Sequence, residues 1–279
     1  MYLGHFGLTE LPFSITPDTQ FIYSAASHQE ALNTLLLAVR GGEGFVKITG
    51  EVGTGKTLLC RRFLATLGDD CVAAYIPNPQ VDANALLREV AEELRVSGDD
   101  GGDTVHIVKR INSHLLELAE QGKTAVLCID EAQTMPTQTL ETLRLISNLE
   151  TEKRKLIQIV LFGQPELDEK LEQPSVRQLR QRIVFHYRMP GLKRAELGAY
   201  LEHRLRVAGY HGGRLFSRFA QRALFRHSGG MPRLVNILAH KALLAAFGEG
   251  DDGVALRHVR AAARDTEGAR KGGWLLLGI

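Results

Sequence analysis

Apolar residues follow two different spacings in the first 190 residues of the chain. Segments with helical spacing alternate with short, nearly continuous apolar runs, which are typical of buried strands. Because such strands have no polar face, we expect a parallel sheet with helices on both of its faces, which is an α/β fold. The expected strands are Phe45 to Thr49, Val72 to Ile76, Ala125 to Ile129, Ile157 to Phe162 and Val184 to Tyr187.

The pattern changes near Pro190, because beyond it the apolar residues recur only at helical spacing. We therefore expect an α/β core at residues 1–190, an all-helical lid at residues 191–266 and a flexible, Gly-rich tail at residues 267–279. The expected lid helices are residues 195–207, 216–227, 233–247 and 256–264.

The composition, 44% hydrophobic and 24% charged, is ordinary for a soluble globular protein. No apolar run approaches the ~20 residues of a membrane-spanning helix, and the N-terminus lacks the basic and apolar regions of a signal peptide. These features predict a cytoplasmic protein. The cysteines lie in apolar segments and the histidines show no metal-ligand spacing, so we expect reduced thiols and no histidine metal site.

Positive charge is concentrated in one part of the chain. Residues 177–241 hold twelve Arg and two Lys but only two Glu, although the whole chain has a net charge of +2. The remaining residues therefore carry a net charge of −10. This asymmetry is compatible with solvated helix faces, with a polar partner, or with head-to-tail self-association of the chain.

A glycine-rich turn follows the first expected strand and opens a helix. Residues 50–57, GEVGTGKT, fit the pattern G-x-x-x-x-G-K-[ST], whose backbone N–H groups cradle phosphate oxygens at a helix N-terminus. In this pattern Lys56 reaches the β- and γ-phosphates of ATP, and the Thr57 hydroxyl ligates Mg²⁺. The residues expected to bind ATP or ADP are Gly50, Glu51, Val52, Gly53, Thr54, Gly55, Lys56, Thr57 and Leu58.

Two acidic residues end the third expected strand. Asp130 and Glu131 directly follow the apolar run, so both are expected at the carboxyl edge of the sheet, beside the glycine-rich turn. We expect Asp130 to hold the Mg²⁺ shell and Glu131 to orient and activate the attacking water. The alternative is an ordinary strand that ends in an exposed turn.

Further polar positions suit phosphate chemistry. Gln164 follows the fourth expected strand, between the two motifs, where it could reach the γ-phosphate or the water. Arg177, Arg180 and Arg182 could supply a finger to a neighbouring subunit's γ-phosphate, or they could be surface charges. Arg233 starts an expected lid helix, where its charge opposes the helix dipole, so a phosphate partner would explain it.

Together these motifs resemble those of the AAA+ superfamily. More narrowly, they resemble the ExeA/GspA family of secretion ATPases and the related MshM-type ATPases of MSHA (type IV) pilus biogenesis. The similarity spans about residues 1–266 and includes the N-terminal sequence YLGHFGLTELPF, IDEAQ at residues 129–133 and FGQPEL at residues 162–167.

The resemblance implies an ATPase that hydrolyses Mg-ATP to drive or regulate assembly of a cell-envelope machine, a pilus or a type II secretion-like system. It also implies a pilus or secretion assembly protein at the inner membrane as a partner. The charge asymmetry and the candidate finger arginines predict an ATP-dependent, head-to-tail homo-oligomer. The resemblance assigns Gln164 to sensor 1, Arg182 (with Arg180 second) to the finger, and Arg233 to sensor 2. It also implies that the N-terminal segment folds over the nucleotide, so that Phe13 and Tyr23 are either adenine neighbours or ordinary core aromatics.

Some features depart from the family pattern or favour another class. ExeA-like proteins continue into a transmembrane segment and a periplasmic region, which this sequence lacks, and this favours the shorter MshM-like form. Gln164 stands where many AAA+ proteins have Asn, Ser or Thr. The alternative is a DNA-associated AAA+ regulator of the TniB/TnsC type, for which the basic residues 177–241 predict salt-dependent DNA binding. A nucleotide-gated binding module without turnover would not need Glu131.

Overall fold

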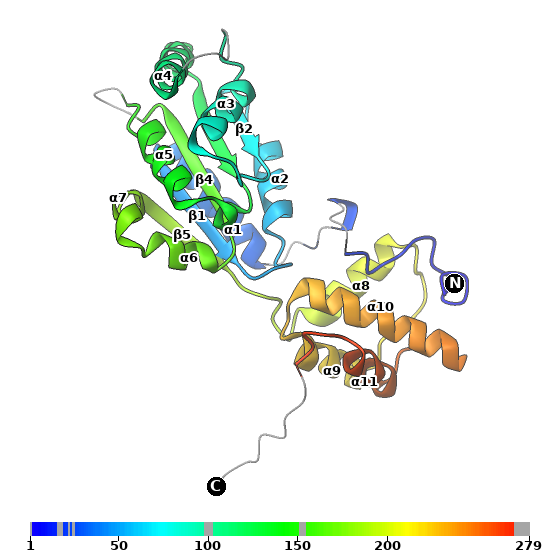
Figure 1. The fold of residues 1–279 in the computed structure, drawn as a ribbon. Helices are drawn as coiled ribbons and strands as arrows, with labels where there is room; N and C mark the ends of the chain where they lie inside the picture. The colour runs from blue at the N-terminus through cyan, green and yellow to red at the C-terminus, as the bar shows by residue number, and fades with distance from the viewer. Residues whose placement is uncertain are drawn as a thin grey trace. The chain divides into compact units, whose positions relative to one another are not determined.

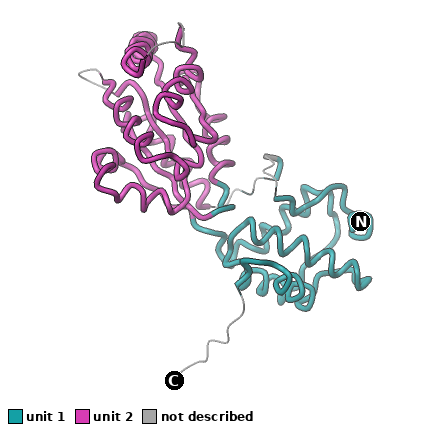
Figure 2. Tube along the Cα trace, in the orientation of Figure 1, with its two compact units in different colours: residues 1–25, 52–55, 190–279 teal, residues 26–51, 56–189 magenta. Residues whose placement is uncertain are grey.

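The protein divides into two compact units in the computed structural model (Figure 2). Unit 1 contains residues 1–25, 52–55 and 190–279, and unit 2 contains residues 26–51 and 56–189. The expected core and lid differ from this division because residues 1–25 and 52–55 cluster with the helices of unit 1. The structure describes residues 2–15, 19–21, 23, 26–97, 103–150 and 155–270, so most of the expected tail lies outside the described residues.

Unit 2 is built on a five-stranded, wholly parallel sheet with the strand order β2-β3-β4-β1-β5. The α/β fold class predicted from the apolar runs is therefore confirmed, and each strand lies within two residues of its expected bounds. The strands are β1 (Phe45–Gly50), β2 (Cys71–Ile76), β3 (Thr124–Ile129), β4 (Ile157–Gly163) and β5 (Ile183–Met189).

Helices cover both faces of this sheet (Figure 1). Asp82 and Asp103 start two of them, because each carboxylate accepts hydrogen bonds from the free N–H groups of the first helical turn. The helices are α1 (Ala26–Gly41), α2 (Lys56–Thr66), α3 (Ala83–Glu93), α4 (Thr104–Glu120), α5 (Thr137–Ser147), α6 (Glu166–Leu171) and α7 (Arg177–Arg180). Short 3-10 turns occupy Ala132–Thr134 and Pro174–Val176.

Alternate side chains of the central strands enter two separate apolar cores. On β3, Leu127 and Ile129 belong to the core that includes α3, α4 and α5, whereas Val126 and Cys128 belong to the core that includes α1 and α2. This two-residue alternation is the reason that the strand is apolar throughout. Apolar packing on both faces therefore holds the sheet in place. Residues that follow the carboxyl ends of its strands are positioned by this packing.

In its described residues, unit 1 combines four α-helices with the N-terminal segment of the chain. Buried apolar residues of the N-terminal segment, including Tyr2 and Phe13, share one core with the helices. Arg204 reinforces this packing, because its buried guanidinium donates to the carbonyls of Pro12 (2.5 Å) and Ser14 (3.3 Å). The helices are α8 (Leu197–Val207), α9 (Arg218–Ser228), α10 (Pro232–Glu249) and α11 (Leu256–Arg264), and a 3-10 turn lies at Thr19–Phe21.

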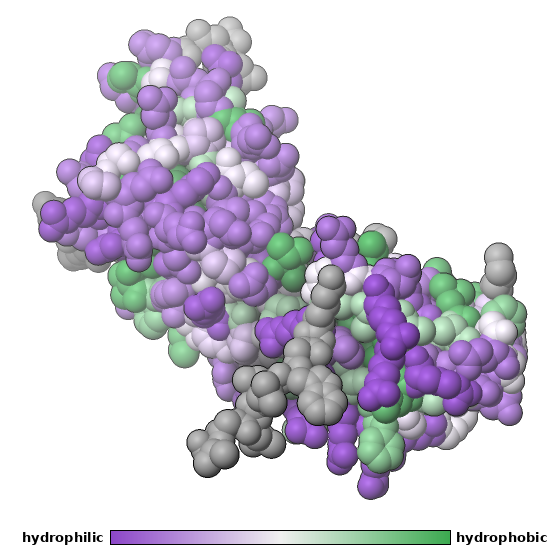
Figure 3. Space-filling model, turned by 60° about the horizontal axis from the view of Figure 1, so that its bottom comes forward, coloured by the Kyte–Doolittle hydropathy of each residue, from purple (hydrophilic) through white to green (hydrophobic). Residues whose placement is uncertain are grey.

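The surface of the two units is mainly hydrophilic on the face that Figure 3 shows, and its apolar groups form small separate spots. Isolated exposed apolar side chains of this kind are normal on soluble domains. Within the described part of the chain, no helix has both the length and the apolar character needed to cross a bilayer.

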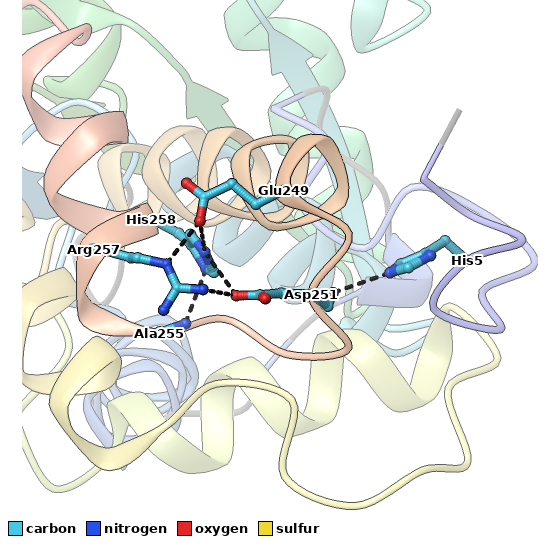
Figure 4. A network of polar contacts seen from close by, with 6 residues as sticks. All are labelled: His5, Glu249, Asp251, Ala255, Arg257 and His258. Atoms are coloured by element: carbon cyan, nitrogen blue, oxygen red, sulfur yellow. Dashed lines mark hydrogen bonds and ion pairs between the residues drawn. The ribbon is translucent and has the colours of Figure 1, made fainter.

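A cluster of charged side chains joins the end of α10 to the start of α11 (Figure 4). The buried Nε2 of His258 lies 3.1 Å from Glu249 Oε2 and 3.2 Å from Asp251 Oδ2, an arrangement that three metal ligands could also adopt. The other ring nitrogen, Nδ1, accepts the backbone N–H of Ala255 at 3.0 Å. A neutral imidazole that accepts at Nδ1 carries its proton on Nε2, so His258 donates to the carboxylates. Arg257 also forms ion pairs with both Glu249 and Asp251. These contacts connect the end of α10 to the start of α11, so the cluster stabilises the junction of the two helices.

Candidate active site

The turn between β1 and α2 needs glycine at two positions. Gly53 and Gly55 have φ angles of 81° and 92°, in the left-handed region that other residues adopt only with strain. The turn begins at Gly50, the last residue of β1, and α2 starts at Lys56. The segment therefore has the strand, glycine turn and helix N-terminus that phosphate-binding loops use.

Lys56 is buried at the start of α2, with 6% of its surface exposed. Its ammonium donates to the carbonyls of Gly50 (2.7 Å) and Glu51 (3.1 Å), which hold it over the turn. Burial lowers the pKa of Lys56, and the carboxylates of Glu131 and Asp130 oppose this effect. A buried ammonium of this kind is stabilised by further negative charge.

Thr57 and Asp130 meet across the sheet edge. The Thr57 hydroxyl donates to Asp130 Oδ2 at 2.6 Å, and the backbone N–H of Glu131 donates to Asp130 Oδ1 at 2.9 Å. Asp130 is only 2% exposed, and burial raises its pKa even though both hydrogen bonds lower it. A cation beside this carboxylate would stabilise its charged form.

These groups fit a magnesium nucleotide. A hydroxyl and a carboxylate oxygen, as in Thr57 and Asp130, are the hard oxygen ligands that Mg²⁺ prefers beside phosphates. Lys56 offers a cation for phosphate oxygens, and burial disfavours the charged forms of both Lys56 and Asp130. A bound anionic phosphate and a bound cation would offset the two unfavourable charges together.

Glu131 has a constrained backbone and a constrained side chain. Its φ and ψ of 50° and 34° are left-handed, which costs a residue other than glycine about 1 kcal/mol or more. Thr134 holds this conformation, because its N–H and its hydroxyl both donate to the Glu131 carbonyl at 2.8 Å. The carboxylate Oε2 accepts from Gln133 Nε2 at 2.5 Å and from Gln164 Nε2 at 3.2 Å. Gln133 has no predicted role, although it lies in the IDEAQ sequence.

Two comparisons of the sequence bear on this site. Residues 39–171, which include the glycine turn, Asp130, Glu131 and Gln164, match the family model described as AAA domain. The general secretion pathway protein A of Aeromonas hydrophila is 41% identical over 275 residues, which cover 98% of this chain and 50% of that protein. The chain is similar to general secretion pathway protein A over nearly its whole length. It spans about half the length of that curated relative.

Solved structures show the same AAA+ fold in more distant proteins. Cdc6p of Pyrobaculum aerophilum has a TM-score of 0.63 and 19% identity over 90% of this chain and 71% of that chain. The ORC2 protein of Aeropyrum pernix has a TM-score of 0.59 and 17% identity over 90% and 72% of the two chains. The RuvB motor of Thermotoga maritima has a TM-score of 0.54 and 17% identity over 85% and 69%. At these identities the likeness shows the fold alone.

The two arginines predicted as fingers have different surroundings. Arg182 Nη1 donates to the buried hydroxyl of Ser147, at the end of α5, at 3.0 Å. Arg180 is exposed at the end of α7. Arg182 therefore contributes to the packing of unit 2 and Arg180 is exposed, and which of the two serves as a finger stays a prediction.

The remaining predicted residues lie in unit 1. Arg233 is the second residue of α10, and a Cβ added at Gly53 would lie 2.2 Å from its Cβ, so only glycine permits this approach. The ring of Phe13 is buried and packs edge-on against the ring of Phe216, with 5.8 Å between the two ring centroids. The ring of Tyr23 packs edge-on against the ring of Tyr200, with 5.6 Å between the two ring centroids. Both aromatic rings therefore have core neighbours of the same unit.

Proposed function

We propose that this chain binds Mg-ATP and hydrolyses it to ADP and phosphate. The main observation in support of this proposal is the hydrogen bond of 2.6 Å between the Thr57 hydroxyl and the Asp130 carboxylate. This contact brings together a hydroxyl and a carboxylate oxygen, both of which are ligands that suit Mg²⁺, and Lys56 and the glycine turn supply groups for the phosphates. The match to the AAA domain model over residues 39–171 supports the same activity.

The proposed roles follow from the chemistry of each side chain. Backbone N–H groups of residues 50–58 and the Lys56 ammonium bind the phosphates. Mg²⁺, when bound to Thr57 and Asp130, neutralises charge that develops on the phosphate oxygens. Glu131 accepts a proton from the water that attacks the γ-phosphorus, while the bond to the ADP oxygen breaks.

Two further residues complete the proposed site. Gln164 donates to Glu131, and in this proposal it also contacts the water or the γ-phosphate, as a sensor 1 residue does. In this proposal the guanidinium of Arg233, at the start of α10, contacts phosphate oxygens of the nucleotide, as a sensor 2 residue does. Its approach to Gly53, a residue of the glycine turn, supports this role.

The work that hydrolysis supports is proposed from the relative. General secretion pathway protein A is named for secretion, so we assign this chain to the assembly of a cell-envelope machine, either a type II secretion-like system or an MSHA-type (type IV) pilus. The proposed partners are other copies of the chain, arranged head to tail, and an assembly protein at the cytoplasmic side of the inner membrane. The charge surplus of residues 177–241 over the rest of the chain supports the head-to-tail arrangement.

Calorimetric titration with Mg-ATP tests the binding step. We expect the wild type and Lys56→Ala to differ in affinity by at least tenfold, because the substitution removes the cation that faces the phosphates. Lys109→Ala, which removes an exposed lysine of α4, is the matched control and should bind like the wild type. Equal affinity in all three proteins would refute the assignment of this site.

One observation supports a second candidate function, that of a DNA-associated AAA+ regulator. Arg218, Arg222 and Arg226 are exposed on one face of α9, about 6 Å apart along the helix, and Arg222 lies over the ring of Phe219, which is 64% exposed. Arg194 and Arg270 line the grooves beside this face. Among the described residues, no acidic side chain pairs with Arg218 or Arg222. Arginines interspersed with an exposed aromatic ring suit a phosphate backbone.

Salt-dependent DNA binding distinguishes this second function. Arg218→Glu/Arg222→Glu should weaken DNA binding and reduce the slope of log affinity against log salt by about 2. Arg260→Glu/Arg264→Glu on α11 makes the same change in net charge and should have little effect. No binding by the wild type at low salt removes DNA as a partner and leaves the ATPase proposal unaffected.

A further inference from the structure

Two amide groups hold the same oxygen of Glu131. Gln133 Nε2 donates to Oε2 at 2.5 Å, and Gln164 Nε2 donates to the same oxygen at 3.2 Å. In the described part of the chain, Oε1 of this carboxylate accepts no hydrogen bond. One oxygen is therefore anchored and the other remains available to accept a proton.

The orientation of the Gln133 amide is determined by its second contact. The backbone N–H of Gln164 donates to Gln133 Oε1 at 3.0 Å. A backbone N–H can only donate, so the oxygen of the Gln133 amide must face Gln164 and its NH₂ group must face Glu131. The backbone N–H of Gln164, just after β4, therefore fixes which end of the Gln133 amide faces the carboxylate of Glu131, just after β3.

The main chain of Gln133 is also held. Lys170 of α6 donates its ammonium to the carbonyl of Gln133, and to the carbonyl of Met135 at 2.8 Å. The side chain and the backbone of Gln133 are therefore fixed by separate elements, α6 and the end of β4. A group held in this way can keep a neighbouring carboxylate in one rotamer.

We propose that Gln133 is a positioning residue that clamps Oε2 of Glu131 and so directs Oε1 toward the attacking water. This inference rests on the proposed ATP hydrolysis and deepens it. Gln133 acts through Glu131 and through the backbone of Gln164, and it touches neither phosphate nor metal. Its loss should therefore reduce the rate of hydrolysis and leave nucleotide affinity unchanged.

The test uses Gln133→Met, which keeps the length of the side chain and removes both hydrogen bonds. We expect kcat to fall by about 10- to 100-fold, as for other supporting residues of a catalytic group. The Kd for a non-hydrolysable ATP analogue and the midpoint of thermal unfolding should stay close to the wild-type values. Gln138→Met, at an exposed glutamine of α5, is the matched control and should hydrolyse ATP like the wild type.

A double-mutant cycle separates positioning from a structural role. In the Glu131→Gln background, adding Gln133→Met should cause no further loss of kcat, because Gln133 acts through the carboxylate that has been removed. A full additional loss in that background, a parallel fall in affinity and unfolding midpoint, or an unchanged kcat for Gln133→Met alone would each overturn the proposal. If the wild type itself does not turn over, the ATPase proposal and this one fail together; if it does, only the positioning role is in question.

Discussion

The hydroxyl of Thr57 and the carboxylate of Asp130 are 73 residues apart in sequence and 2.6 Å apart in the structure. The sheet order explains this contact, because β1, which leads into the glycine turn, and β3, which leads into Asp130, flank the same strand, β4. Their carboxyl ends open on one edge, and Gln164 follows β4 between them. The candidate site is thus a consequence of parallel strand order.

Asp130→Asn should stabilise the protein without ligand while abolishing its stabilisation by Mg-ATP. Burial raises the pKa of Asp130 above its unfolded value, so this group favours folding at pH values below the unfolded pKa and loses that contribution as pH rises through the folded pKa. Near pH 7 the charged carboxylate is therefore a cost, which the neutral amide removes. We expect a gain of about 0.5–2 kcal/mol at neutral pH, measured by thermal unfolding.

The pH dependence provides the control for this prediction. Below the carboxyl pKa, Asp130 is protonated in both states, so the gain from Asp130→Asn should disappear. A substitution that destabilises the ligand-free protein at pH 7 would contradict the view that the hydrogen bonds to Asp130 do not offset the cost of burying its charge. Retention of the full Mg-ATP effect by Asp130→Asn would contradict its role in holding the metal.

Arg180 and Arg182 should fail in different ways when they are changed to alanine. Arg182→Ala breaks the contact with Ser147 and should lower the unfolding midpoint of unit 2. Arg180→Ala should fold normally and lose hydrolysis in the assembled state, where a finger arginine contributes ~10³–10⁵ in rate. The measurement is ATP turnover of each variant above and below the concentration at which the wild type assembles.

Mixing variants then shows whether the finger acts between subunits. Arg180→Ala provides an intact glycine turn and Lys56→Ala provides an intact finger, so an inactive pair should recover partial turnover on mixing. A mixture that co-assembles and stays inactive would contradict the trans arrangement. The same mixture with Arg182→Ala in place of Arg180→Ala shows which arginine is needed.

The cluster of charged side chains between α10 and α11 should behave as a set of ion pairs and not as a metal site. Its members are Glu249, Asp251, Arg257 and His258. His258→Ala removes a buried ring with two hydrogen-bonding nitrogens and should cost about 2 kcal/mol of stability. His258→Gln keeps a donor toward the carboxylates and should be milder. Addition of Zn²⁺ should leave the unfolding midpoint of the wild type unchanged, and a Zn²⁺-dependent rise that His258→Ala removes would contradict this reading.

The strands of the sheet could be predicted because each is apolar on both faces and several residues long. The short helices α6 and α7, of six and four residues, were not predicted, because a segment of one or two turns shows too few repeats of the helical spacing. The positions of Lys56, Thr57 and Asp130 follow from motifs that combine strands, turns and helix starts. Their roles in binding and catalysis stay predictions.

Contacts that depend on distant parts of the chain could not be predicted. Nothing around Arg204 in the sequence indicates that its guanidinium binds the carbonyls of Pro12 and Ser14, which attach the N-terminal segment to α8. The position of Gln133 depends in the same way on the end of β4, which follows about 30 residues later. A count of positive charge also does not separate Arg204 and Arg182, which have buried partners, from exposed arginines such as Arg218.

Phosphate release from Mg-ATP by the wild type and by Glu131→Gln tests the central claim most directly. The amide keeps the shape of the side chain but cannot accept the proton, so we predict that turnover falls by ~10²–10⁴ while affinity for Mg-ATP is retained. Both proteins are measured in one assay, with binding determined by calorimetry on the same samples. Equal turnover of the two proteins, or no magnesium-dependent turnover by the wild type, would contradict the account.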